Sequence, residues 1–178
     1  MEEILRTSRL WLRPLTPEDT DSLCQIMQDP EAMTAYERCY SRQEVQQWIA
    51  RNQKRYQTDG AGLWAVILTE SGILIGQCGL VWQQEAGMAF WEVGYLFNRQ
   101  YWHQGYATEA AMACRDYAFA HLKAPAVYSI IKHNNLPSQR VAERCGMTRW
   151  RTLHFGGAKL QLQDTLHYLY RVENPAQP

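Results

Sequence analysis

The stretch from Trp91 to Glu109, WEVGYLFNRQYWHQGYATE, constrains the fold more than any other part of the chain. Aromatic and β-branched residues alternate with other residues from Trp91 to Tyr95, which predicts a strand that ends near Asn98. Small and apolar residues recur at spacings of three and four from Thr108 onward, which predicts a helix with a close-packing face. A strand, a polar and aromatic connection and a helix are therefore the framework on which the other segments are placed.

The connection contains Gly105 and Ala107 and leads into the first turn of the predicted helix. Amides of a first helical turn have no partner within the helix, and the helix dipole adds positive potential there, so this arrangement predicts an anion site, usually for phosphate. The loop lacks the Lys-Ser/Thr ending of a nucleoside-triphosphate loop and the three glycines of a dinucleotide fingerprint. Neither of those two kinds of site is expected.

With 178 residues the chain is expected to form one domain over 1–178, with a loose tail at 174–178. It has 18 basic and 18 acidic residues and a pI near 7, so there is no basic field to bind nucleic acid or an anionic membrane. An uncharged small substrate or a local peptide site stays open.

The five cysteines lie far apart and mostly within apolar patterns, which indicates reduced core residues and a reducing, cytoplasmic location. No apolar run is long enough for a signal peptide or a membrane span. The five histidines show no ligand spacing, so no metal is expected.

The remaining segments predict a sheet flanked by helices. Ser41 and Glu44 form a capping box that begins a helix, and a period of two from Leu63 to Tyr95 indicates an antiparallel meander. The other predicted elements are a strand at Arg9 to Leu15, a helix from Thr16, a strand at Ala126 to Lys132 beside the Trp91 strand, a helix capped by Asn135 and stopped at Gly146, and a closing hairpin of Met147 to Phe155 and Leu162 to Val172.

Five segments together resemble the GNAT superfamily of acyl-CoA N-acyltransferases, and within it the ribosomal-protein N-terminal (RimJ/RimL-type) branch. They are RLWLRPLTPEDTDSL, IGQCGL, EVGYLFNRQYWHQGYATEA, NNLPSQRVAERCGM and the approach from Gly157 to Asp164. The resemblance covers nearly the whole chain. It implies an α/β fold with a mixed, mostly antiparallel sheet of about seven strands, splayed at the cofactor site, and about four helices.

The resemblance also implies that acetyl-CoA lies where the Trp91 and Ala126 strands diverge, with its pyrophosphate on the amides of His103 to Ala107. A bulge or a close backbone approach at Gly94 would let main-chain groups bind the pantetheine arm and polarise the thioester carbonyl. The implied cofactor-binding residues are Tyr95, Leu96, Phe97, Trp102, His103, Gln104, Gly105, Tyr106, Ala107, Thr108, Asn135, Ser138 and Arg140.

An amine acceptor is mostly protonated at neutral pH, since its pKa is about 8 for an α-amino group and about 10.4 for a lysine. Attack on the thioester therefore needs a base, directly or through water. Glu92 resembles the glutamate that serves as general base in related acetyltransferases, and it shares a strand face with Gly94. The alternative is a solvent-facing or ion-paired strand carboxylate.

The departing thiolate needs a proton, and many members use a tyrosine where this chain has Ala142. The resembling branch offers Ser138 instead, with Asn135 placing the cofactor, although the Ser138 hydroxyl has an alternative role in the first turn of its helix. Cys145 is a further candidate acid or a buried core residue. Trp102 stands where many members carry Gln or Arg, which has little effect if main-chain amides bind the phosphates, and His103 either adds charge there or has no role.

The resulting hypothesis is acetyl transfer from acetyl-CoA to a primary amine by direct attack, without an acyl-enzyme. The acceptor is a protein N-terminus or a small amine such as a polyamine, antibiotic or amino acid, and Tyr36, Glu37, Arg38 and Trp48 are candidates to line its pocket. Several carboxylates in that pocket would favour a polyamine or aminoglycoside, and an open groove a peptide. A homodimer and a non-catalytic acyl-CoA-binding module remain open alternatives.

Overall fold

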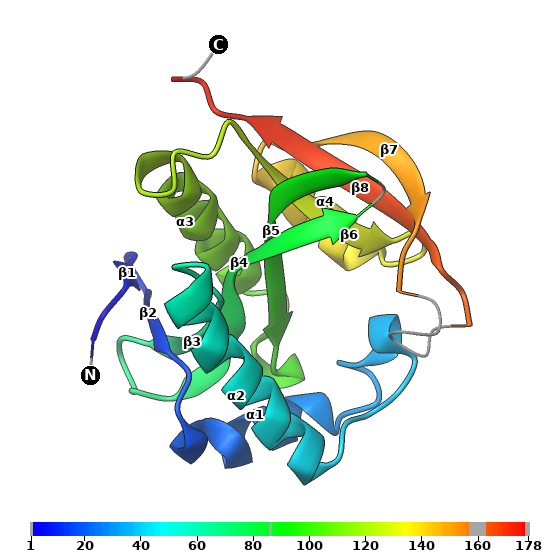
Figure 1. Ribbon diagram of the computed structural model, residues 1–178. Coiled ribbons are helices and arrows are strands. Elements are labelled where there is room, and N and C mark those ends of the chain that lie inside the picture. Colours follow the sequence, from blue (N-terminus) through cyan, green and yellow to red (C-terminus); the bar gives the residue numbers. More distant parts are fainter. Residues whose placement is uncertain (1, 86, 157–162, 177–178) are drawn as a thin grey trace.

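The computed structural model describes residues 2–85, 87–156 and 163–176, and this part of the chain contains one sheet of eight strands (Figure 1). The strands lie in the order β1-β2-β3-β4-β5-β6-β8-β7, and neighbours are antiparallel except for β5 and β6. The bounds are Leu5–Arg6 for β1, Leu10–Pro14 for β2, Leu63–Leu68 for β3, Leu74–Glu85 for β4, Met88–Phe97 for β5, Ala126–Lys132 for β6, Thr148–His154 for β7 and Leu166–Glu173 for β8.

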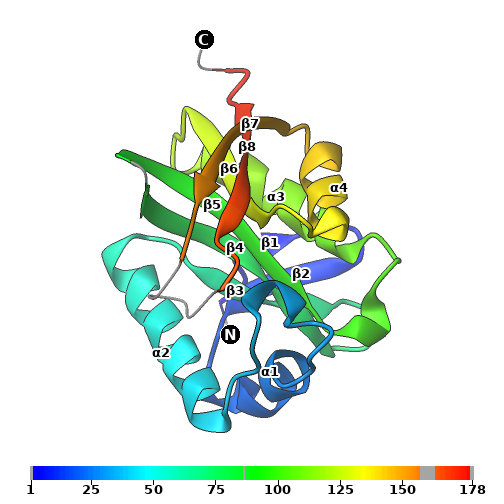
Figure 2. The same cartoon turned by 90° about the vertical axis from the view of Figure 1, so that its right-hand side faces the viewer.

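Helices cover both faces of this sheet, as Figures 1 and 2 show. The four α-helices of the described residues are α1 (Thr20–Met27), α2 (Arg42–Thr58), α3 (Tyr106–Ala120) and α4 (Leu136–Arg144). One buried cluster joins α1 and α2 to one face, and a larger one joins α3 and α4 to the other. The predicted mixed, mostly antiparallel α/β fold with four helices is therefore confirmed, and the two-residue β1 brings the expected seven strands to eight.

The N-terminal helices begin where their capping residues stand. The Ser41 hydroxyl accepts a hydrogen bond from the amide of Glu44 at 3.3 Å, and the Glu44 carboxylate accepts one from the Ser41 amide at 2.8 Å, which confirms the predicted capping box. At Thr16 a single 3-10 turn comes before α1, and the buried Asp19 carboxylate accepts bonds from the Thr16 amide and from the Arg13 guanidinium. These bonds hold the end of β2 against α1.

The helix α3 is a crossover between two parallel strands, as predicted. The ladder between β5 and β6 is short, because only Trp91 with Val127 and Glu92 with Tyr128 are paired. Beyond Glu92 β5 continues along β4, while β6 continues along β8. The two strands diverge beyond Glu92 and Tyr128, as the resemblance implies, and we call the gap between them the β5–β6 divergence.

No bulge occurs at Gly94, so that part of the prediction is wrong. The register between β4 and β5 runs without a shift from Gly76 opposite Phe97 to Glu85 opposite Met88. The divergence arises on the other side of β5, where β6 leaves it. A side chain at Gly94 would meet only Leu63, at 3.4 Å, so the backbone beside Glu92 stays uncrowded on this face.

The C-terminal segment is anchored at its start. Asn174, the first residue of the tail predicted to be loose, is buried and bonds the carbonyls of Pro125 and Ala124 through its main-chain and side-chain nitrogens. Most of the Gly157 to Asp164 approach, residues 157–162, lies outside the described residues. Within the described ranges, every helix is too short or too polar to cross a membrane.

Candidate active site

Glu92 lies where the ladder between β5 and β6 ends. We call the side of β4, β5 and β6 on which Glu92, Gly94 and Tyr128 project the Glu92 face. The Glu92 carboxylate accepts a hydrogen bond from the Gln83 side-chain amide at 2.6 Å and one from the Ile130 main-chain amide at 3.3 Å. Its carboxylate thus bonds an amide of β6 just beyond the last paired residues, and it stands at the mouth of the divergence.

The protonation of Glu92 is unusual for a glutamate. The Glu92 side chain is half-buried, and this burial raises the pKa of its carboxyl group to about 7. The hydrogen bonds from Gln83 and Ile130 and the charge of Arg55 act in the opposite direction. Among the described residues no cation forms an ion pair with it, so the alternative of an ion-paired strand carboxylate does not describe this side chain. A carboxyl with a pKa near 7 exchanges protons readily at neutral pH.

One main-chain unit of β5 faces the divergence without a strand partner. In an antiparallel pair the N–H and C=O of one residue point to the same side, and the Val93 carbonyl bonds the Ser129 hydroxyl of β6 at 2.9 Å. Tyr95, two residues on, therefore points its N–H and C=O the same way, beyond the end of the β5–β6 ladder. The Phe97 carbonyl bonds the Trp102 indole at 3.0 Å, so Tyr95 is the residue of this row with both groups directed at the gap.

Leu96 and Phe97 differ from Tyr95. Leu96 is paired with Gln77 of β4, and its side chain packs against the cluster beneath α1 and α2. Phe97 is buried with the opposite cluster. Their side chains are thus core residues, and the prediction that Leu96 and Phe97 bind the cofactor stays a prediction about their main chain.

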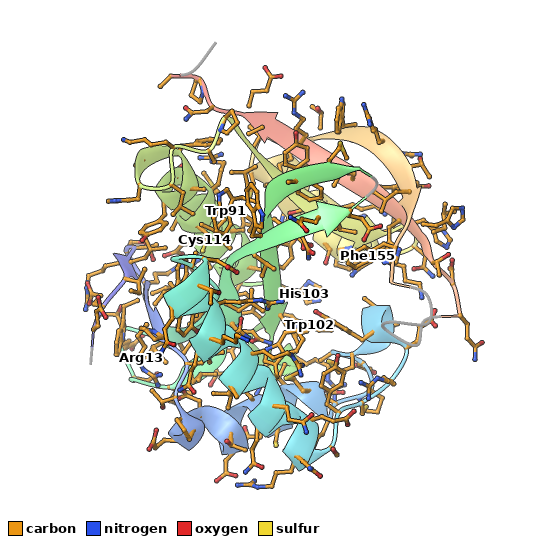
Figure 3. All side chains as sticks on the ribbon, viewed as in Figure 1. Arg13, Trp91, Trp102, His103, Cys114 and Phe155 are labelled. Atoms are coloured by element: carbon orange, nitrogen blue, oxygen red, sulfur yellow. The ribbon has the colours of Figure 1, made fainter. Side chains whose placement is uncertain are left out.

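The predicted anion loop ends at an accessible helix N-terminus. His103 and Gly105 have φ of 61° and 83°, and this left-handed backbone turns the chain into α3, whose first turn is Tyr106, Ala107 and Thr108. His103, Gln104 and Gly105 are exposed, whereas Trp102 is half-buried between the two core clusters (Figure 3). Trp102 therefore anchors the loop to the core, and the main-chain amides from His103 onward remain open to an anion.

An N-terminal turn holds this loop in place. The Glu109 carboxylate, in the first turn of α3, accepts hydrogen bonds from the Thr7 hydroxyl at 2.6 Å and from the Arg9 side chain at 2.7 Å. The Arg9 guanidinium also donates to the Gln104 carbonyl at 3.0 Å and lies 4.4 Å above the Tyr106 ring. The Glu109 carboxylate is thereby bonded to Thr7 and Arg9, and the positive charge of Arg9 offsets its negative charge beside the loop.

The helix α4 begins at Asn135, as predicted, and carries the other candidate residues. The Asn135 side-chain oxygen accepts a hydrogen bond from the Ser138 amide at 3.3 Å, so Asn135 performs the capping. The Tyr95 hydroxyl donates to the Ser138 carbonyl at 2.9 Å and joins β5 to α4 across the divergence. Within the described part of the chain the half-buried Ser138 hydroxyl makes no hydrogen bond, and the Arg140 side chain is exposed.

Ala142 and Cys145 complete the inner side of α4. Both are buried, and Ala142 offers no hydroxyl where many relatives carry a tyrosine. Burial raises the pKa of the Cys145 thiol to about 12, and the thiol lies 3.9 Å from the Thr108 carbonyl. Cys145 is therefore a protonated core residue, as its second interpretation stated.

The four residues considered for the acceptor pocket have different surroundings. Tyr36 and Trp48 form an edge-to-face cluster with Tyr40, in which the ring centroids lie 5.9 to 6.5 Å apart. Arg38 pairs with Glu44 at 2.7 Å on the surface.

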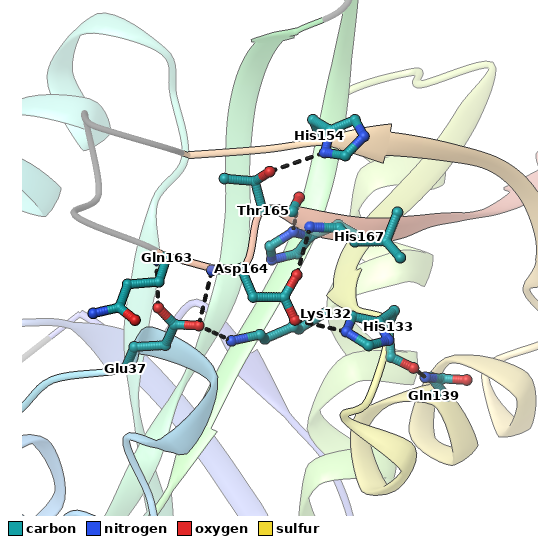
Figure 4. Close-up of polar contacts among 10 residues, drawn as sticks. Glu37, Lys132, His133, Gln139, His154, Gln163, Asp164, Thr165 and His167 are labelled. Carbon is teal, nitrogen blue, oxygen red and sulfur yellow. Dashed lines mark hydrogen bonds and ion pairs between the residues drawn. The ribbon is translucent and has the colours of Figure 1, made fainter.

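Glu37 instead joins two distant segments, as Figure 4 shows. Its carboxylate pairs with Lys132 at the end of β6 and accepts the Gln163 amide at 2.6 Å, and Asp164 bonds His133 at 2.6 Å. The Lys132 ammonium and these amides lower the pKa of Glu37. The segment before α2 is thus connected to the approach to β8.

Folding brings only some of the predicted site residues together. Glu92, Tyr95, Asn135 and Ser138 surround the divergence, and the residues from Trp102 to Thr108 form the loop beside it. The side chains of Leu96 and Phe97 pack in the core, and that of Arg140 is exposed on α4. Four further residues near the site were not predicted, because no local pattern shows which distant segment they approach: Arg9, Arg55, Gln83 and Lys132. In the described ranges no three His, Cys, Asp or Glu side chains gather as metal ligands.

Known proteins share this arrangement. Residues 9–148 match the model of the acetyltransferase (GNAT) domain. The chain is 35% identical over 142 residues to an uncharacterized N-acetyltransferase, p20, of Bacillus licheniformis, covering 76% of this chain and 77% of that protein. A GNAT-family acetyltransferase from Bacillus anthracis superposes with a TM-score of 0.79 at 26% identity, over 97% of this chain and 99% of that one.

The structure of RimL, a ribosomal α-N-protein acetyltransferase in complex with coenzyme A, superposes with a TM-score of 0.77 at 15% identity, over 98% of this chain and 99% of that one, which shows the shared fold. The family match extends from β2 to the start of β7 and includes both the α3 loop and the Asn135 cap. The chain belongs to the GNAT acetyltransferase family.

Proposed function

We propose that this protein transfers an acetyl group from acetyl-CoA to a primary amine by direct attack of the amine on the thioester. The observation that carries the proposal is the position of Glu92. Its carboxylate lies at the mouth of the β5–β6 divergence, with a pKa raised to about 7, two residues before an uncrowded Gly94. A base of this pKa accepts a proton from an ammonium group at neutral pH more readily than an ordinary glutamate does.

The residues around the divergence then have distinct roles. Glu92 removes the proton of the amine, directly or through water, and the nitrogen forms a bond to the acetyl carbonyl carbon as the bond to sulfur breaks. The Tyr95 N–H is the main-chain donor available to the developing oxyanion. The Ser138 hydroxyl, which has no partner among the described residues, supplies a proton to the thiolate or orders the water that does.

The donor is held through the α3 loop. The exposed amides from His103 to Ala107 suit a pyrophosphate, because the left-handed residues open this turn and the nearby Glu109 is already bonded to Thr7 and Arg9. RimL, which shares the fold, is known in complex with coenzyme A. We extend that binding mode to this chain as part of the proposal.

Titration calorimetry with acetyl-CoA, and with ATP as the control nucleotide, tests donor binding. Micromolar binding of acetyl-CoA alone is expected, and a folded sample that binds neither would refute the donor assignment. Turnover is then measured by thiol release against a panel of amines. Glu92→Gln should keep acetyl-CoA affinity and lower kcat by about 10²- to 10⁴-fold, the usual contribution of a general base.

A matched variant, Glu143→Gln, removes a carboxylate from the exposed side of α4 and should leave kcat unchanged. Ser138→Ala reports on protonation of the leaving group, and it should lower kcat less than Glu92→Gln because water also reaches this position. The non-catalytic alternative predicts acetyl-CoA binding with no turnover of any amine. Release of free thiol that depends on an amine would exclude that alternative.

A further inference from the structure

The helix α2 carries a row of three residues, of which Trp48 and Arg55 are half-buried and Arg51 is exposed. Trp48, Arg51 and Arg55 are spaced by three and four, so they follow one another along the helix surface. The Trp48 indole donates a hydrogen bond to Gln77 of β4 at 2.8 Å, which fixes the Trp48 end of this row over the Glu92 face. The Arg51 guanidinium lies 5.6 Å from the Trp48 ring, and Arg55 is the next residue of the row.

Arg55 is half-buried and lacks a carboxylate partner. Its only hydrogen bond among the described residues is a long one, 3.4 Å, to the side-chain oxygen of Asn52. The residues outside the described ranges include no aspartate or glutamate, so no further acidic side chain is available to pair with it. Burying an arginine without an anion is costly, and a guanidinium is suited to bind a carboxylate through two hydrogen bonds.

The charges around Arg55 point the same way. Burial lowers the pKa of Arg55, and the like charge of Arg51 lowers it further, while Asp59 and Glu92 raise it. Neither of these two carboxylates forms an ion pair with it. The charges of Glu92 and Arg55 thus influence each other although no hydrogen bond or ion pair joins the two side chains.

The Glu92 face has no surplus of carboxylates. Glu37 is paired with Lys132, Asp164 with His133, and Glu173 with Arg171. Glu85 lies four residues beyond the position opposite Glu92, at the end of the β4–β5 hairpin. A polyamine or an aminoglycoside needs several free carboxylates near the reactive amine, and these ion pairs leave fewer of them, which disfavours both.

We propose that Arg55, assisted by Arg51, binds an anionic group of the acceptor, so that the substrate is a primary amine with a carboxylate close to the reactive nitrogen. The inference rests on the proposed function and names its substrate class. The carboxylate pairs with Arg55, and the ammonium group lies toward Glu92, which takes its proton. Free α-amino acids have this chemistry, and so do peptides with an acidic residue near the N-terminus.

The test compares each α-amino acid of a panel with its own carboxamide, which keeps the side chain and loses the negative charge. The wild type should prefer the acid over the amide in kcat/KM, and Arg55→Gln should reduce that preference about ten- to hundred-fold, as expected for a hydrogen bond between charged groups. The change should lie in KM for the acid. Differences in amine basicity cancel, because both enzymes are given the same pair.

Two control variants separate binding from a structural effect. Arg55→Lys retains the charge and should restore part of the preference. Lys54→Gln removes a positive charge from the neighbouring, exposed position on α2 and should leave the preference unchanged. Thermal unfolding of each variant, together with its acetyl-CoA affinity, shows that the fold and the donor site are intact.

The outcomes are distinct. An equal preference for acid and amide in the wild type, or faster acetylation of putrescine than of any acid, would overturn the inference while leaving the acetyltransferase function standing. If no amine is acetylated, the proposed function fails, and saturation-transfer NMR of the acid and amide with CoA-saturated protein still decides whether Arg55 binds the carboxylate. Tripeptides with aspartate or asparagine at the second position distinguish acidic peptides from free amino acids.

Discussion

The raised pKa of Glu92 makes a prediction about stability that needs no substrate. A carboxyl group with a pKa of about 7 in the folded chain, instead of the ordinary 4.5, binds more protons folded than unfolded between these two values. The free energy of unfolding should therefore decrease as the pH rises from 4.5 to 7. Glu92→Gln, which has no charge to bury, should lack this decrease.

The magnitude follows from the shift. Each pKa unit corresponds to about 1.4 kcal/mol, so the charged form of Glu92 destabilises the fold by about 3 kcal/mol at pH 8 and by about 1 kcal/mol at pH 5. The side chain is half-buried, and contact with water makes these values upper bounds. Gln83 can rotate its amide by half a turn and present its oxygen to the new glutamine, so the hydrogen bond at this position is retained.

Urea unfolding at half-unit steps from pH 5 to 8 measures the effect. The free energy of unfolding of Glu92→Gln, relative to wild type, should increase by about 2 kcal/mol over this range, with most of the change below pH 7. Glu143→Gln, which removes an exposed carboxylate on α4, is unfolded over the same range as the matched control. A difference between Glu92→Gln and wild type that does not vary with pH would refute the raised pKa and, with it, the physical basis for Glu92 as a base.

Three further substitutions test the supports of the site. Gly105→Ala should destabilise the fold by about 1 to 2 kcal/mol, because φ of 83° is unfavourable for alanine, and should weaken acetyl-CoA binding in calorimetry. Asn52→Leu leaves the Leu63 amide without its 3.0 Å partner in the core, and we expect a loss of about 1 to 3 kcal/mol in urea unfolding. Asn135→Ala removes the cap of the Ser138 amide and should cost about 1 kcal/mol, with a smaller effect at Asn135→Ser, which still caps.

Local patterns predicted the elements that depend on neighbouring residues. Ser41 and Asn135 begin their helices because a short polar side chain reaches an amide three residues ahead, and this is visible in the sequence. The strand Ala126 to Lys132 was placed with its observed bounds and its parallel partner. The two-residue β1 was missed, since it is held by its partner β2 and too short to show a pattern.

The details of the site depend on contacts between distant segments. No periodicity relates Glu92 to the Ile130 amide, or Arg55 to Glu92, because those relations are set by where β6 leaves β5 and by how α2 rests on the sheet. The bulge predicted at Gly94 failed for the same reason. A glycine within a strand indicates an irregularity nearby but does not say which one. Here the ladder between β5 and β6 ends beside Gly94, while the pairing of Gly94 with β4 stays regular.

The bonds between Thr7 and Glu109 join residues that are 102 positions apart, and the bond between Tyr95 and Ser138 spans 43. The proposed donor site is assembled from such separated segments and requires the whole sheet, so we expect a partly unfolded chain to have no affinity for the donor. Binding therefore opposes global unfolding rather than local fraying. A ligand at a hundred times its Kd would raise the free energy of unfolding by about 2.7 kcal/mol, and an N-terminal turn far from the chemistry shares in that stabilisation.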